Sequence, residues 1–193
     1  MHRKYVFLFI FVMAAFLAGC AARMENEESP GAMSQPRAAS LTETARLENL
    51  SSSPPADCPI TLPQKPPFVP PPPYDHLGFE GEFWYGSNSL WTAVRQNGTW
   101  EALPHNPEGY TQKVFWWREG YSVGEEPEPA LTVTAERLDG KAPSIQGSKA
   151  TNASASDIGS AMLVGVDLPT LGCWKITGKY RDAELSFVVW AAP

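Results

Sequence analysis

The sequence predicts an all-β fold, an antiparallel β-sandwich, over residues 79–193. Turn-forming residues recur between short apolar or alternating segments, all seven tryptophans lie beyond residue 79, and no later segment has helical periodicity. Residues 1–78 lack this pattern. We expect them to form a signal segment (1–19), a flexible tether (20–57) and a proline-rich strap (58–78).

Eight segments have the composition of strands. They are residues 81–85, 90–95, 99–103, 112–119, 130–138, 160–166, 173–180 and 184–190. Between the second and third, Asn97-Gly98 matches a type I′ turn, in which both central residues take positive φ, and this predicts a β-hairpin. In the fifth, Leu131, Val133 and Ala135 alternate with polar residues and are predicted to face the core.

The last two predicted strands form the best-defined hairpin. Trp174, Ile176 and Gly178 fall on one face, and polar residues alternate with them on the other. The Gly-Cys-Trp-Lys-Ile-Thr sequence at 172–177, followed by a valine-rich last strand, resembles the final strand pair of immunoglobulin-like domains in bacterial surface proteins.

The N-terminus has the layout of an export signal. A cationic start precedes the apolar residues 5–17, and about 13 such residues are too few to cross a bilayer of ~30 Å. Leu-Ala-Gly-Cys at 17–20 resembles the lipobox of bacterial lipoproteins. That resemblance implies cleavage before Cys20, a diacylglycerol on its thiol and a further acyl chain such as palmitate on its amine. The alternative is an ordinary secretory signal with a chance cysteine.

Residues 79–193 resemble a family of uncharacterised bacterial lipoproteins. The recurrent pieces are Phe-Trp-Tyr-Gly at 83–86, Leu-Trp-Thr at 90–92, residues 113–120 and the closing hairpin. The resemblance implies an immunoglobulin-like β-sandwich behind a lipid anchor in the cell envelope, and it carries no known activity. Ala21, which is not Asp, further implies the outer membrane if the source has two membranes.

The segment between the signal and the sandwich has two parts. Residues 20–57 contain no aromatic side chain and cannot bury enough surface to order themselves, so we expect a disordered tether. Residues 58–78 include four consecutive prolines and favour polyproline II. This part is either a spacer, a ligand for a partner, or a strap held to the domain by Cys58, Phe68, Val69 and Tyr74.

Cys58 and Cys173 remain as a pair once Cys20 is assigned to lipidation. In an oxidising compartment such a pair favours a disulfide, here closing a loop of about 115 residues. Two free buried thiols are the alternative.

The charge balance argues against nucleic acid as a partner. The full chain has 15 Lys and Arg against 21 Asp and Glu, and loss of residues 1–19 removes two cations, which takes the formal charge from −6 to −8. Attachment to a membrane would therefore depend on the lipid anchor.

The sequence contains few candidates for chemistry. Nucleophile-elbow, zinc-protease and phosphate-loop motifs are absent. His105 and Glu108 are too few for a zinc site, the acidic loop 125–128 lacks calcium-loop spacing, and Asp157 and Asp167 are either turn caps or a hydrolytic carboxylate pair. We therefore expect no catalytic residue, no metal and no cofactor, with a hydrolase as the enzymatic alternative.

The excess of aromatic residues is the strongest functional signal. Strand alternation puts some rings on the face away from the core, where they are either covered by the strap or form an exposed platform. The candidate ligand-binding residues are Trp84, Trp91, Trp116, Trp117 and Arg118. The expected function is a membrane-anchored, extracytoplasmic binding module with an envelope protein as partner. A cell-wall or other glycan ligand, and a purely structural surface domain, are the alternatives.

Overall fold

The computed structural model describes residues 52–75 and 80–193, and the regular structure of these parts is β-strand throughout. The strands are β1 (Glu82–Ser87), β2 (Leu90–Arg95), β3 (Thr99–Trp100), β4 (His105–Asn106), β5 (Gly109–Trp117), β6 (Leu131–Arg137), β7 (Ile145–Gln146), β8 (Thr151–Ala155), β9 (Gly159–Leu168), β10 (Gly172–Tyr180) and β11 (Ala183–Ala191). No helix long and apolar enough to cross a bilayer occurs in residues 52–75 or 80–193. The predicted signal segment, Cys20 and most of the tether lie outside the described residues.

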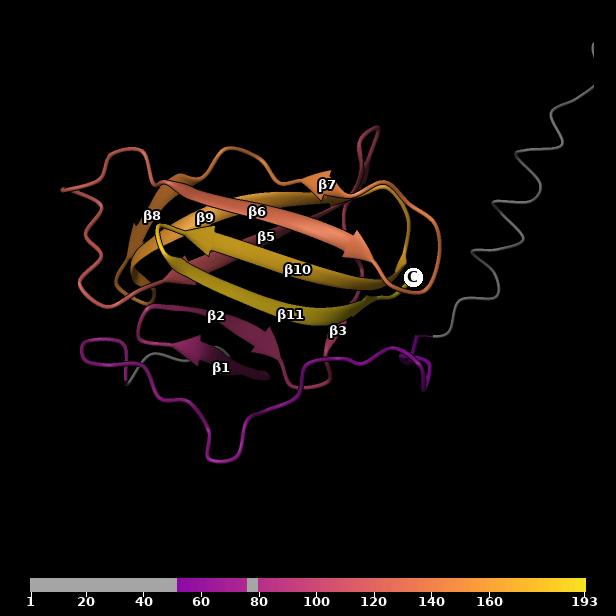
Figure 1. Ribbon diagram of the computed structural model, residues 1–193, viewed down its shortest axis with the longest axis horizontal. Coiled ribbons are helices and arrows are strands. Elements are labelled where there is room, and N and C mark those ends of the chain that lie inside the picture. The colour runs from indigo at the N-terminus through magenta and orange to yellow at the C-terminus, as the bar shows by residue number, and fades with distance from the viewer. Residues whose placement is uncertain (1–51, 76–79) are drawn as a thin grey trace, which may run out of the picture. The chain divides into compact units, whose positions relative to one another are not determined.

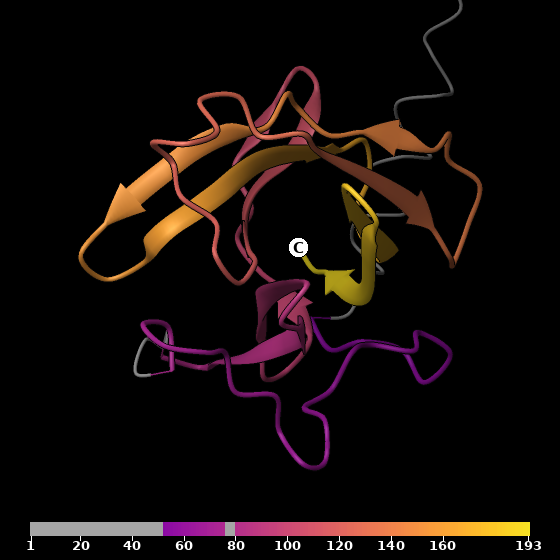
Figure 2. The same ribbon diagram turned by 60° about the vertical axis from the view of Figure 1, so that its left-hand side comes forward.

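The strands form two sheets (Figure 1). The first has the order β1-β2-β5-β9-β8, with β4 beside β5, and the second has the order β3-β11-β10-β6-β7. All pairs are antiparallel except β3 with β11. In Figure 2 the orange strands β8 and β9 arch over one side of the domain, and the yellow C-terminal strands lie across from them. The predicted all-β sandwich is confirmed.

The main core lies between the two sheets. Trp116 of β5 and Met162 of β9 meet Trp174, Ile176 and Phe187 of the second sheet, and all five side chains are buried. The predicted inward face of residues 131, 133 and 135 is also confirmed, because these three are buried while their neighbours are half-buried or exposed. The core therefore follows the period-two alternation of the strands.

The outer faces of both sheets carry further apolar side chains, and residues 52–75 cover part of each. Cys58 and Ile60 pack on Trp190 of the second sheet, whereas Phe68 and Tyr74 pack on the first. Figures 1 and 2 both show this purple segment passing along the β1–β2 hairpin. The segment is thus a strap held to the domain.

One of the predicted strap contacts is wrong. Val69 is 62% exposed and does not hold the strap. Thr61 does so instead, because its N–H donates to the Val188 carbonyl oxygen at 2.9 Å and its hydroxyl accepts from the Val188 N–H at 2.8 Å. The predicted contacts of Cys58, Phe68 and Tyr74 are confirmed, and the additional contact is made by a polar residue.

The predicted Asn97-Gly98 hairpin is also wrong. Only Gly98 has a positive φ, and the strand that follows pairs in parallel with β11 of the second sheet and not with β2. The turn is a crossing between sheets, in which the Gly98 carbonyl oxygen accepts from the N–H of Trp190 at 2.9 Å. By contrast, the predicted C-terminal hairpin is confirmed, with β10 and β11 paired from Gly172↔Ala191 to Tyr180↔Ala183.

Candidate functional site

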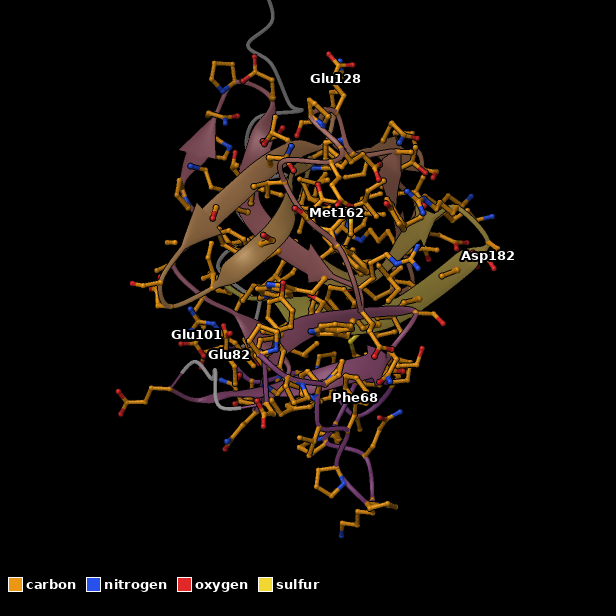
Figure 3. All side chains as sticks on the ribbon, turned by 90° about the vertical axis from the view of Figure 1, so that its left-hand side faces the viewer. Phe68, Glu82, Glu101, Glu128, Met162 and Asp182 are labelled. Atoms are coloured by element: carbon orange, nitrogen blue, oxygen red, sulfur yellow. A yellow bond between two sulfur atoms is a disulfide. The ribbon has the colours of Figure 1, made fainter. Side chains whose placement is uncertain are left out.

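The residues of the expected aromatic platform do not share one surface. Trp116 points into the main core, whereas Trp84, Trp91 and Trp117 lie on the outer face of the first sheet. Figure 3 shows the two sides, with Phe68 of the strap below the β1–β2 strands and the core residue Met162 above them. Trp91, Trp116 and Trp117 are each 0% exposed. These three side chains are therefore buried and form no exposed platform, with Trp116 in the main core and Trp91 under the strap.

Trp91 is the centre of the strap-covered cluster. The ring of Phe68 lies 6.0 Å from it and the ring of Tyr74 lies 5.6 Å away, while Trp84 and Trp117 pack edge to face at 5.1 Å. The indole Nε1 of Trp91 is buried without a hydrogen-bond partner among the described residues. Desolvation of that donor costs stability, so the packing of the rings must outweigh it.

The strap is also fixed covalently. The predicted disulfide between Cys58 and Cys173 is present, with 5.7 Å between the two Cα atoms. Cys173 lies in β10 and is fully buried, and Trp190, Ala192 and Ile60 surround the pair. The bond therefore joins the start of the strap to the second sheet.

An open cleft lies between β2 and β5, beyond the edge of the strap-covered cluster. These strands pair only at Trp91↔Trp117 and Thr92↔Trp116, whereas β5 stays paired with β9 from Tyr110 to Trp116. Because β2 then diverges from β5, a cavity of about 160 Å³ opens between them. Its lining residues are Glu82, Ala93, Arg95, Trp100, Gln112, Lys113, Val114, Phe115 and Trp117.

The cleft has an apolar floor and a charged rim. Trp100, Val114 and Trp117 are buried at the floor, whereas Arg95 and Lys113 are exposed at the rim. At Thr92, the last position where β2 pairs with β5, the hydroxyl donates to the Phe115 carbonyl oxygen at 2.7 Å. Such a cavity can hold one apolar group and attract a negative charge beside it.

Glu82 is the one acidic group of this cleft. It is half-buried in β1, directly opposite Arg95 of β2, and Figure 3 shows it at the side of the first sheet. Burial raises the pKa of Glu82, and the positive charge of Arg95 partly opposes that rise. Two cations and one carboxylate leave the rim positive in an acidic chain.

Asp157, Asp167 and His105, which the sequence offered for hydrolysis or metal binding, do not come together in one site. Asp157 is exposed in the turn before β9 and Asp167 lies near the far end of that strand, roughly 30 Å away at ~3.3 Å per residue. The carboxylate pair considered for hydrolysis is therefore not formed, and Asp167 instead accepts a hydrogen bond from Thr111. His105 packs on Tyr110, and the part of the chain that the structure describes contains no cluster of three or more metal-ligating side chains.

Sequence reasoning missed most of the cleft. Trp117 was a candidate, but Trp100, Glu82, Arg95 and Lys113 were not, because only the divergence of β2 from β5 brings them together. Arg118 was a candidate and lies apart from the cleft, over the ring of Tyr180. Protein-family models, curated proteins and solved structures were compared with the chain, and none of them matches it.

Proposed function

We propose that the chain is a membrane-anchored, extracytoplasmic binding module whose partner is an envelope protein. The lipobox-like residues 17–20 support the anchor, and the Cys58–Cys173 disulfide is of the kind that forms in oxidising compartments. Because Ala21 follows the lipidated cysteine, the lipid anchor lies in the outer membrane if the cell has two membranes. The module binds and performs no reaction.

The β2–β5 cleft is the observation that carries this proposal. Its volume of about 160 Å³ lies below the ~300 Å³ at which pockets for small molecules begin, but it suits one large side chain. Protein interfaces draw much of their affinity from a few side chains seated in such pockets. The positive rim of Arg95 and Lys113 adds a preference for an acidic residue beside that anchor.

A glycan ligand is the second candidate. It is favoured by the half-buried ring of Phe115, which lines the cleft, since flat aromatic faces suit sugar rings. The covered state of Trp91 argues against the broad platform that a polysaccharide would need. A glycan would therefore have to insert only its terminal sugar residue into the cleft.

Site-specific photocrosslinking in intact source cells tests the proposal. A crosslinking residue at Gln112, on the cleft, should capture one dominant envelope protein, whereas one at the exposed Lys141 should not. Reversal of one rim charge by Lys113→Glu should weaken the crosslink and leave the melting temperature nearly unchanged, because Lys113 is exposed.

Equal crosslinking from positions 112 and 141 would contradict a specific partner at the cleft. It would favour the alternative that the chain is a purely structural surface domain. Loss of the protein crosslink together with a tryptophan fluorescence change on adding neutral oligosaccharides would replace the envelope protein by a glycan.

A further inference from the structure

A second cavity lies where the loop after β5 meets the β10–β11 turn. It has a volume of about 250 Å³ and shares no lining residue with the β2–β5 cleft. Its principal side chains are Arg118, Tyr121, Ser122, Glu126, Tyr180 and Arg181. Most of these are polar groups, brought together from sequence positions about 60 residues apart.

Glu126 is fully engaged within this cavity. One carboxylate oxygen accepts from the Ala130 N–H at 2.8 Å, and the other accepts from the Tyr180 hydroxyl and from Arg181 at 2.9 Å. Partial burial would raise the pKa of Glu126, but these hydrogen bonds outweigh burial and lower it. Glu126 and Arg181 therefore neutralise each other.

Arg118 is in a different situation. Its guanidinium lies 5.5 Å from the centre of the Tyr180 ring, and its Nε donates to the Glu119 carbonyl oxygen at 3.3 Å. None of the described carboxylates forms an ion pair with it. Arg118 is half-buried, its guanidinium is positioned by an aromatic ring, and its two terminal nitrogens are available to a ligand.

We propose that this cavity binds a carboxylate group, held by the terminal nitrogens of Arg118, whose guanidinium lies over the Tyr180 ring. A planar guanidinium pairs with a carboxylate through two parallel hydrogen bonds. Only one cation of the cavity is uncompensated, and Glu125 at its edge repels further negative charge, so a singly charged carboxylate fits better than a phosphate dianion. This site is independent of the cleft and of the proposed envelope partner.

Binding of small carboxylates to the purified mature chain tests the assignment. N-acetylalanine should shift the NMR signal of the Arg118 Nε–H in a saturable way at millimolar concentration, and N-acetylalaninamide, which lacks the charge, should not. Glucuronate carries its carboxylate on a sugar, whereas N-acetylalanine resembles the end of a peptide. Whichever of the two binds more tightly shows whether the ligand is a sugar acid or a peptide carboxylate.

Three variants make the test specific. Arg118→Gln should weaken carboxylate binding at least tenfold without lowering the melting temperature, whereas Arg95→Gln, at the unrelated cleft, should leave it unchanged. Glu126→Gln keeps an acceptor for Ala130 and releases Arg181, so it should tighten binding severalfold and admit inorganic phosphate. Equal binding of the amide, full binding by Arg118→Gln, or no gain with Glu126→Gln would each overturn the proposal.

Discussion

The ring of Tyr74 in the strap meets the indole of Trp91 in β2 edge-on, with 5.6 Å between the centroids and 69° between the planes. The Tyr74 hydroxyl donates to the Ser160 carbonyl oxygen at 3.1 Å, so the side chain is held at both ends. Gly159 leaves room for the ring, because a Cβ there would lie 2.6 Å from it. The strap is therefore fitted to the sheet at this point and does not merely pass over it.

Replacement of Tyr74 by alanine should destabilise the domain by about 3 kcal/mol, since it removes a buried ring and leaves a cavity above Trp91. The tryptophan emission should also move to longer wavelength as Trp91 gains contact with water. Val69→Ala is the matched control in the same strap, because Val69 is 62% exposed and should cost almost nothing. Equal urea midpoints for the two variants would show that Tyr74 does not hold the strap.

Reduction of the disulfide should lower the free energy of unfolding by about 4–5 kcal/mol. The chain-entropy account gives this value for a closed loop of the size set by a sequence separation of 115. Urea denaturation with and without reductant measures the difference, and a Cys58→Ser, Cys173→Ser double variant should be insensitive to reductant. An unchanged midpoint after verified reduction would refute this expectation.

Gly178 in β10 lies opposite the six-membered ring of Trp116, where a Cβ would come within 2.5 Å. Gly178→Ala should therefore cost about 1–3 kcal/mol, as overpacking of a filled core usually does. Gly124→Ala is the control, since its Cβ would meet nothing closer than 3.8 Å, and it should be neutral or slightly stabilising. Thermal unfolding of both variants provides the comparison, and similar melting temperatures would contradict the steric argument.

Tyr121 should make the domain sensitive to alkaline pH. Burial, followed by the charge of Glu126 and the neighbouring Tyr180, raises the pKa of Tyr121 to about 12 from 10. A raised folded pKa means that stability is retained below pH 10 and lost as the pH rises from 10 towards 12. Tyr121→Phe should reduce this loss in urea titrations at successive pH values. Since burial and the hydrogen bond to Glu126 also raise the pKa of Tyr180, part of the dependence should remain, and identical profiles for both proteins would count against the assignment.

Much of the fold could be predicted because its pattern is local. The β10–β11 hairpin shows alternation on both strands and a two-residue turn, so neighbouring sequence specifies both its existence and its faces. The strands β7 and β8 were missed for the opposite reason. Residues 151–155 are small and mostly polar, and they form a strand because β9 offers its edge over five residues. Such a strand depends on its partner and not on its own composition.

The candidate site was harder to predict because it depends on how separate segments meet. Alternation correctly put Trp116 and Trp117 on opposite faces, but it could not show that the strap would cover Trp91 or that β2 would diverge from β5. The Asn97-Gly98 signal failed in the same way, since the contact of Gly98 with Trp190 is set by the other sheet. The neighbouring sequence therefore determined which face of a strand each side chain is on, but not which distant segment packs against that face.

The strap crosses from one sheet to the other, and this determines where a recombinant fragment can begin. A fragment that begins at Glu82, in the first strand, would lack the strap residues that cover Trp190 and Trp91. It would expose an apolar surface on each sheet to solvent. Such a product should collect in inclusion bodies, whereas one that starts ahead of Cys58 and is oxidised should be recovered soluble. The practical beginning of the domain is therefore a cysteine more than twenty residues before its first strand.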